Sequence, residues 1–261
     1  MKFWIFSRRK VWLVLLGIGA AVLLIVAGVG LLGAAGDKST LSTGQATKEI
    51  PIYFVQKEEP VLALSFDAAW GCERTEKILA VLKEYEVQAT FFLTNIWLED
   101  YPEMAQKIAA DGHEIAMHSV SHPHMNNLPP EEVLTELAGN QKMITEITGY
   151  QPKLFRFPFG EYNNQNVILV REQGYAPIQW SIDSLDWKEM LSKDDIVRRV
   201  TDNLHNGAII LCHNNGQWTA EAIAEIIPYA LEKGYSFLPI GKMIYSDFSA
   251  VDQQGRQMPP F

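Results

Sequence analysis

The chain has 261 residues and a formal net charge of −9, with 31 acidic against 22 basic residues. Outside the N-terminal flank, no run of basic residues is longer than the pair Arg198–Arg199, which excludes nucleic acid as an expected partner. The two cysteines, Cys72 and Cys212, are too few for a disulfide scaffold, although in an exported protein they can still pair.

The N-terminus combines a basic flank with a long apolar run. Lys2 and the three basic residues at 8–10 precede residues 11–35, which carry no charge. This run is longer than the ~20 helical residues that cross a bilayer, and a basic flank stays in the cytoplasm. The sequence therefore predicts a cytoplasmic flank at 1–10 and a single-pass transmembrane signal-anchor at 11–35, with the rest of the chain outside the cell membrane. A cleavable signal peptide is the alternative, although its apolar region is usually only ~7–15 residues long.

The rest of the chain divides by composition. Residues 36–60 are polar and lack a hydrophobic period, as an extracytoplasmic linker does. Residues 61–245 are long enough to bury the core of one domain. Residues 246–261, with paired glutamines and a final pair of prolines, are expected to form a loose C-terminal tail.

Short apolar runs alternate with amphipathic stretches throughout 61–245. The predicted strands are 61–66, 88–93, 114–118, 154–157, 177–182, 208–212 and 236–240. Several of them are apolar almost throughout, as strands buried on both faces are. The alternation predicts an α/β fold with a parallel sheet and right-handed crossovers. Periodicity alone leaves a closed barrel and an open sheet as alternatives.

Glycines and caps mark the predicted helix boundaries. The residue just past a helix often takes a left-handed backbone, which glycine adopts without strain. Five glycines are expected in that role: Gly112, Gly149, Gly174, Gly207 and Gly234. Helix starts are expected at Pro130, which suits a first helical turn, and after Ser192, which can cap together with Asp195.

Polar residues gather where the predicted strands end. In β/α barrels, reactive groups lie at the carboxyl ends of the strands. One polar residue there is explained as a capped strand end, but five polar segments at successive strand ends predict an active site. They are Asp67-Ala68-Ala69-Trp70-Gly71, His118-Ser119-Val120-Ser121-His122, Arg156-Phe157-Pro158-Phe159-Gly160, Asp183-Ser184-Leu185-Asp186-Trp187 and Leu211-Cys212-His213.

His118 and His122 are four residues apart, the spacing of one helical turn, so both imidazoles can face one point. Two imidazoles suit a divalent metal, with zinc expected and cobalt or manganese as alternatives. Taken alone, this spacing is weak evidence for a metal site.

The five segments, in this order and spacing, resemble the NodB-homology polysaccharide deacetylases, the fourth carbohydrate esterase family. The resemblance covers about 61–240, and it implies a distorted (β/α) barrel of seven to eight strands. The order of anchor, linker and domain, with Ser65-Phe66-Asp67-Ala68-Ala69-Trp70-Gly71 as the first motif, is similar to membrane-anchored, sporulation-type members.

The resemblance implies a metal-assisted hydrolysis of an N-acetyl group. Asp67 matches the general base that takes a proton from the attacking water, and Arg156 matches the arginine that orients this base. His118 and His122 match metal ligands. Such chemistry needs a Lewis acid, because an acetamide is a poor electrophile.

The remaining motif positions match the acid and the walls of the family's site. His213 matches the general acid that protonates the leaving amine. Asp183 matches the carboxylate that tunes this histidine, with Asp186 as the second candidate. Phe159 stands where the family uses a backbone N–H against the oxyanion, and the walls around the acetyl methyl correspond to Trp187 and Leu211.

One position departs from the family pattern. The first motif usually carries two adjacent acids, of which the second is the third metal ligand, and here that position is Ala68. Three interpretations follow: Asp67 binds the metal itself, catalysis has been lost, or water or another side chain fills the place. The side-chain candidates are Cys72, Glu73, His124 and Asn214.

The sequence thus predicts a hydrolase that removes N-acetyl groups from a cell-wall amino-sugar polymer, peptidoglycan or its spore-cortex form. The alternative is a metal-poor, catalytically impaired relative that only binds glycan. A protease or other amidase is disfavoured because no nucleophile motif is present. The sequence leaves open whether N-acetylglucosamine or N-acetylmuramic acid is cut, and it leaves the oligomeric state open.

Overall fold

The computed structural model describes residues 48–245 and 250–260. The expected flank at 1–10, the expected anchor at 11–35 and residues 36–47 of the expected linker lie outside these residues. Within the described ranges, none of the helices has both the length and the apolar character that a membrane span requires. The compact unit that contains the site runs from Lys48 to Phe261.

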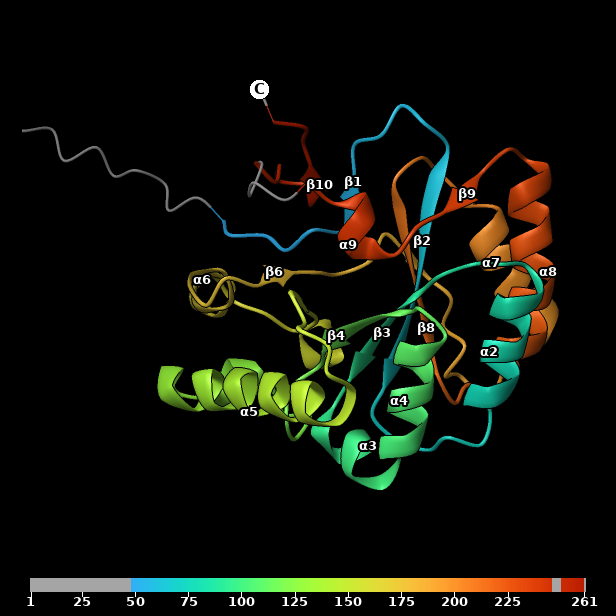
Figure 1. The fold of residues 1–261 in the computed structure, drawn as a ribbon. Helices are drawn as coiled ribbons and strands as arrows, with labels where there is room; N and C mark the ends of the chain where they lie inside the picture. Colours follow the sequence, from blue (N-terminus) through green and yellow to red (C-terminus); the bar gives the residue numbers. More distant parts are fainter. Residues whose placement is uncertain (1–47, 246–249, 261) are drawn as a thin grey trace, which may run out of the picture. The chain divides into compact units, whose positions relative to one another are not determined.

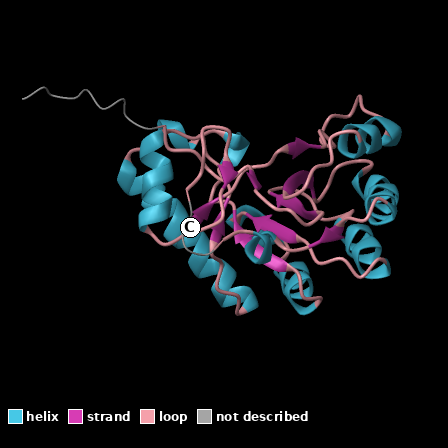
Figure 2. Cartoon of the chain, turned by 90° about the horizontal axis from the view of Figure 1, so that it is seen from above, coloured by secondary structure: helices cyan, strands magenta, loops and turns pink. Residues whose placement is uncertain are grey.

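A curled, mainly parallel sheet forms the centre of this unit, and helices lie around its outside (Figures 1 and 2). The strands follow the order β10-β1-β8-β2-β3-β4-β5-β6, with β7 paired to β8 and β9 paired to β2. Their bounds are β1 Phe54–Val55, β2 Val61–Ala68, β3 Thr90–Leu93, β4 Glu114–Met117, β5 Leu154–Phe155, β6 Ala176–Pro177, β7 Ile182–Asp183, β8 Ala208–His213, β9 Ser236–Phe237 and β10 Arg256–Gln257.

The α/β class and the parallel strands are confirmed, but the closed barrel is not. β5, β6, β7 and β9 are each two residues long, so the sheet curls into a half-barrel with short ladders on one side. One isolated parallel bridge, between Ile52 and Ile178, joins the chain before β1 to the chain after β6. The curl brings the carboxyl ends of several strands toward one another. Parallel α/β sheets carry their functional sites at these carboxyl ends.

Strand β2 shows how the pleat sorts its side chains. Leu62, Leu64, Phe66 and Ala68 belong to the core between the sheet and the helices. Val61 and Ala63 belong to the second core, on the inner side of the curl. Because successive side chains point to opposite faces, Asp67 follows the inner set. The parallel register of β2 and β8 pairs Asp67 with His213.

The helices are α2 Thr75–Glu84, α3 Asn95–Asp100, α4 Pro102–Ala110, α5 Pro130–Thr148, α6 Asn164–Glu172, α7 Lys193–Thr201, α8 Thr219–Glu232 and α9 Ile240–Met243. The predicted start at Pro130 and the capping box of Ser192 with Asp195 are confirmed. All five glycines have positive φ, between 72° and 87°. Gly207, however, does not end a helix; it forms the turn before β8, where a Cβ would lie 1.8 Å from the carbonyl oxygen of Val55.

Two predicted boundaries need correction. The expected linker contributes β1, which pairs with β8 and β10, and the expected tail contributes β10 itself. The single strand expected at 177–182 is divided into β6 and β7. It is interrupted because Gln179 turns its backbone N–H to Ile52 and its carbonyl to the Arg156 guanidinium.

Candidate active site

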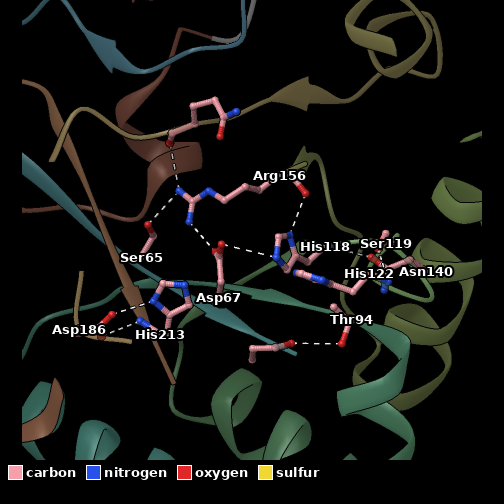
Figure 3. Close-up of polar contacts among 12 residues, drawn as sticks. Ser65, Asp67, Thr94, His118, Ser119, His122, Asn140, Arg156, Asp186 and His213 are labelled. Atoms are coloured by element: carbon pink, nitrogen blue, oxygen red, sulfur yellow. Dashed lines mark hydrogen bonds and ion pairs between the residues drawn. The ribbon is translucent and has the colours of Figure 1, made fainter. Parts of the chain in front are cut away.

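A pocket of about 670 Å³ opens at the carboxyl ends of β2 and β8. It brings together residues from all five polar segments of the sequence (Figure 3). Its lining includes Asp67, Trp70, Arg74, His118, His122, Phe159, Trp180, Asp183, Asp186, Trp187, Glu189, Leu211 and His213.

Asp67, which lines the pocket, forms a buried ion pair with Arg156, which lies behind the pocket wall. The Nη1 of Arg156 donates to Oδ1 of Asp67 at 2.6 Å, while Nη2 donates to Ser65 Oγ at 3.0 Å and to the carbonyl of Gln179 at 3.1 Å. The guanidinium, which is fully buried, also lies 3.9 Å from the centre of the Phe92 ring. Arg156 is therefore held on several sides and fixes the direction of the Asp67 carboxylate.

The charge of this pair keeps Asp67 ionised. Burial by itself would raise the pKa of Asp67, but the positive charge of Arg156, with smaller contributions from His118 and His213, outweighs burial and lowers it. This geometry suits a general base that is kept ready in its charged form.

His118 is held with one ring nitrogen turned toward Asp67. Its Nδ1 lies 2.9 Å from the carbonyl of Arg156, an acceptor, so this nitrogen carries the proton. Its Nε2 is then the unprotonated nitrogen and lies 3.6 Å from Oδ2 of Asp67. Asn140, from α5, fixes the backbone by accepting from the His118 N–H at 2.9 Å. Such a carbonyl contact is how metal-binding histidines are usually oriented.

His122 lies beside His118, with ring centroids 5.0 Å apart. Trp70 and Phe159 flank its imidazole at 4.9 and 4.5 Å. Burial is the main cause that lowers the pKa of His122 to about 4, and the neighbouring His118 is the second cause. The His122 ring is therefore neutral at pH 7. Its Nδ1 is buried and makes no hydrogen bond within the described residues.

His213 is paired with Asp186 and not with Asp183, which corrects the expected assignment. Nδ1 of His213 lies 2.7 Å from Oδ1 of Asp186, and its backbone N–H donates to Oδ2 at 2.8 Å. The Asp183 carboxylate instead accepts from the backbone N–H of Leu185 at 2.9 Å. Burial would lower the pKa of His213, but the hydrogen bond and charge of Asp186 raise it, so the imidazolium form is favoured.

The loops at the pocket hold strained backbone. Five described non-glycine residues have positive φ, and four of them belong to the site: Ser119, His122, Phe159 and Leu185. Ser119 compensates by accepting from the His122 N–H at 3.0 Å. Strain of this kind persists where surrounding contacts enforce it, and it clusters at functional sites.

The expected walls also line the pocket. Leu211 is nearly fully buried on β8, whereas Trp187 and Phe159 are 56% and 52% exposed. The Phe159 ring stacks on His124, with centroids 4.2 Å apart. Large aromatic faces at a pocket mouth suit sugar rings, whose C–H faces are apolar.

A scan against protein-family models matches residues 55–178 to the Polysaccharide deacetylase family. The chain is also 34% identical over 186 residues to a peptidoglycan-N-acetylglucosamine deacetylase of Bacillus cereus, covering 70% of this chain and 67% of that protein. The chain belongs to the polysaccharide deacetylase family.

Other relatives of this deacetylase-family chain come from Bacillus subtilis. It is 33% identical over 190 residues to the peptidoglycan-N-acetylmuramic acid deacetylase PdaC, covering 72% of this chain and 40% of PdaC. It is 34% identical over 186 residues to the uncharacterized protein YlxY, of which it spans 58%.

Solved structures similar to this chain include both active and inactive proteins. The peptidoglycan N-acetylglucosamine deacetylase Bc1960 matches with a TM-score of 0.71 and 32% identity, over 74% of this chain and 91% of that one. BA3943 from Bacillus anthracis, described as a CE4 family pseudoenzyme, matches with a TM-score of 0.72 and 29% identity, over 81% of this chain and 74% of that one. A BA3943 mutant described as having restored enzymatic activity matches with a TM-score of 0.72 and 31% identity, over 76% and 72% of the two chains.

The donors fit the family's metal only in part. Two neutral imidazoles are present, one oriented by a carbonyl and the other with an unpartnered buried nitrogen. Ala68, where the third ligand is expected, is fully buried in the core between the sheet and the helices, and its carbonyl accepts from Thr94. Across the described ranges, no group of three His, Cys, Asp or Glu side chains is arranged to hold a metal.

None of the proposed substitutes for the third ligand joins the two histidines. His124 binds Glu161 at 2.9 Å, and Glu73 accepts from the backbone N–H of Cys72. The amide nitrogen of Asn214 donates to the carbonyl of Gly71 and to Thr75. Cys72 is a free thiol, as is Cys212, so the two do not form a disulfide.

Several supporting residues have no signal in the sequence pattern. Thr219, at the start of α8, donates to Oδ2 of Asp186 at 2.5 Å. Gln179 donates from Nε2 to the carbonyl of Gly160 at 2.8 Å, and Asn140 holds His118 from the middle of α5. A buried Asn or Gln within an apolar stretch is the one available clue, because such a side chain must find partners.

Proposed function

We propose that this chain is a metal-assisted N-deacetylase of an amino-sugar polymer of the cell wall, peptidoglycan or its spore-cortex form. The observation that carries the proposal is that one pocket holds two catalytic candidates with paired charges: a base beside a cation and an acid beside an anion. Arg156 lowers the pKa of Asp67 and so favours its charged form, and Asp186 raises the pKa of His213 and so favours its protonated form. A purely structural role explains neither pair, since both lie at a concave site and both have shifted pKa values.

The residues available to hold a divalent ion are His118 and His122, with Asp67 beside them. When bound, such an ion polarises the acetamide carbonyl and lowers the pKa of water. Because two protein ligands replace the usual three, the site is expected to hold zinc weakly.

The base step belongs to Asp67. Its Oδ1 is bound by Arg156, so Oδ2, on the His118 side, is the oxygen that takes a proton from the attacking water. The oxygen of the resulting hydroxide forms a bond to the carbonyl carbon of the acetyl group. The electrons of the C=O double bond move onto the carbonyl oxygen. The backbone N–H of Phe159 is proposed to stabilise that oxygen, as the family resemblance implies.

The acid step belongs to His213. Its Nδ1 is engaged by Asp186, so Nε2 donates the proton to the departing nitrogen as the carbon–nitrogen bond breaks. The products are acetate and a free amino sugar. Leu211 and Trp187 are proposed to enclose the acetyl methyl, which matches their place in the pocket wall.

We further propose that the domain acts outside the cell membrane, attached by the apolar segment 11–35. The basic flank and the uncharged run of the sequence support this location. A cell-wall polymer is accessible only from that side.

A second candidate function is glycan binding without catalysis. It is favoured by Ala68, whose methyl group occupies the core where a ligand is expected. The chain is similar to BA3943, a CE4 family pseudoenzyme, and this similarity is consistent with that alternative.

Acetate release separates the two functions. The full chain, purified in a non-ionic detergent, would be given peptidoglycan glycan strands in chelator and then in excess zinc or cobalt. Release that depends on the metal supports the deacetylase. Glycan binding without release under any of these metals supports the binding protein and contradicts our proposal.

A further inference from the structure

Arg74 is the single lysine or arginine among the described residues that line the pocket. It precedes α2 and is half-buried, and its side chain makes no capping hydrogen bond to that helix. Neither the acid–base chemistry nor the metal site described above uses this residue. Its position is therefore a separate feature of the pocket.

The guanidinium of Arg74 is fixed by the loop that follows His213. Its Nη1 donates to the backbone carbonyl of Asn215 at 3.2 Å and to the Asn215 Oδ1 at 3.3 Å. Asn215 in turn packs against Gly71, where an added Cβ would lie 2.1 Å from the Asn215 amide nitrogen. Gly71 also has a φ of 67°, which glycine tolerates best. The local backbone thus makes room for the side chain that holds Arg74.

Unlike most other arginines in the domain, Arg74 makes no ion pair with a carboxylate among the described residues. Among the described residues, ion pairs bind Arg156, Arg171, Arg198 and Arg256 to carboxylates, and none involves Arg74. The exposed carboxylate of the adjacent Glu73 accepts from the Cys72 N–H and from the Asn215 side chain, and it interacts with the charge of Arg74 without forming an ion pair. Within the same described ranges, Nη2 and Nε of Arg74 make no hydrogen bond, so two donor positions remain on a held, planar group.

We propose that Arg74 binds a carboxylate carried by the glycan, so that the pocket prefers muramic-acid-containing strands over strands of N-acetylglucosamine alone. This inference rests on the proposed function, because it assumes that the pocket receives a cell-wall glycan. A guanidinium presents paired N–H donors that match a carboxylate, and such charge-assisted bonds are stronger than neutral ones. The carboxylate is either that of the lactyl ether or that of an attached peptide.

The other charges of the pocket limit where an anion is accepted. Asp67 and Asp186 are already compensated by Arg156 and His213. Asp183 and Glu189 also line the pocket, and within the described residues neither carboxylate forms an ion pair; Arg199 binds only the backbone carbonyl of Asp183. They disfavour an anion next to themselves, which leaves the wall formed by Arg74 and Asn215 as the site for it.

Equilibrium binding in chelator tests the proposal without requiring turnover. Calorimetry on the full chain in detergent would compare four glycans: a neutral N-acetylglucosamine tetramer, a peptide-free tetramer alternating with N-acetylmuramic acid, the methyl ester of the latter, and the same tetramer with peptides attached. A preference of roughly tenfold, or about 1.4 kcal/mol, is expected for a carboxylate-bearing form over the neutral tetramer. The ester and the peptide-bearing form identify which carboxylate is responsible.

Arg74→Gln should remove that preference, and binding of the neutral tetramer by the variant shows that it is folded. Lys77→Gln is the matched control, because Lys77 is an exposed cation on α2 that does not line the pocket. It should behave as the parent chain does. Equal affinity of the parent chain for all four glycans, or a preference that survives Arg74→Gln, would overturn the proposal.

A parallel acetate assay keeps this inference distinct from the proposed function. Preference lost in Arg74→Gln without any acetate release would contradict the deacetylase and leave the carboxylate site standing. Metal-dependent release without any preference would leave the deacetylase standing and contradict the role of Arg74.

Discussion

The Asp186 carboxylate binds His213 at two points: the backbone N–H of His213 at 2.8 Å and the Nδ1 of its ring at 2.7 Å. Thr219 donates to the same carboxylate at 2.5 Å, so the aspartate is fixed from both β8 and α8. Since Nδ1 faces an acceptor, it carries a proton, and Nε2 can donate only in the imidazolium form. The aspartate therefore sets both the orientation and the protonation state of the proposed acid.

Asp186→Asn should move the high-pH limb of the pH–rate profile to lower pH. The charge and hydrogen bond of Asp186 raise the pKa of His213 against the effect of burial, which lowers it. Without that charge, burial prevails and the acid loses its proton earlier as pH rises. At neutral pH, the rate should fall by about tenfold or more. The full pH dependence of acetate release measures both effects.

Asp183→Asn is the control for this prediction. It removes a carboxylate that also lines the pocket but binds the Leu185 N–H rather than His213. Its high-pH limb should lie close to that of the parent chain. A shift larger in Asp183→Asn than in Asp186→Asn would return the tuning role to Asp183.

Asp67→Asn should destabilise the fold, by about 3 kcal/mol in urea unfolding at pH 7, because it leaves the buried Arg156 charge uncompensated. The pKa of Asp67 in the folded chain lies below its value of 3.8 in the unfolded chain. Its contribution is therefore present above that value and is lost as pH falls through the lower, folded one. Asp252→Asn, which opens a surface pair with Arg256, should change the stability little. Equal stability of Asp67→Asn and the parent chain would show that the pair contributes no net stability.

Ala68→Asp should make stability depend on metal. The new carboxylate would enter a fully buried position, so the variant in chelator should melt at a lower temperature than the parent chain. If it completes the metal site as the family pattern implies, zinc should restore the melting temperature and bind at least about tenfold more tightly than to the parent chain. Ala89→Asp, which also places a carboxylate at a fully buried position but does not line the pocket, is the control and should gain no zinc affinity. Destabilisation that zinc leaves unchanged would show that position 68 cannot reach His118 and His122.

Gln257→Leu should destabilise the domain although residue 257 lies far beyond the site in sequence. Gln257 is buried, and its amide binds both the N–H and the carbonyl of Tyr245, at 3.0 and 2.8 Å. Losing both bonds should cost about 2 kcal/mol or more. Gln253→Leu, at an exposed position, should be neutral in the same urea titration. An unaffected Gln257→Leu would mean that the two bonds to Tyr245 add nothing to the stability of the domain.

The strands that carry the site were predictable because they are apolar and several residues long. β2, β3, β4 and β8 agree with the predicted runs to within a few residues. Strands β1 and β10 were not predictable, because a strand of two residues shows no periodicity and the partners of these strands lie far away in the sequence. The division of 177–182 was also invisible, since it follows from the contacts of Gln179 with Ile52 and Arg156.

Most of the site was predictable from motif positions at strand ends. Asp67, His118, His122, Arg156 and His213 all line or support one pocket, as expected. The choice between Asp183 and Asp186 was not predictable, because Asp183 ends the short strand β7, Asp186 lies only three residues beyond it, and the strained turn at Leu185 lies between them. Arg74 had no motif, and its place in the pocket depends on a loop more than a hundred residues away.

The most direct test of the acid–base account is acetate release by the full chain in excess zinc, compared with Asp67→Asn and His213→Ala. General acid and base groups each contribute about 10²–10⁴-fold, so each variant should lose at least a hundredfold in rate while still binding glycan. Glycan affinity measured on the same samples distinguishes lost chemistry from lost folding. Zinc-dependent release by the parent chain that both substitutions abolish is the predicted result. Release that survives either substitution, or no release by the parent chain with any metal, would contradict it.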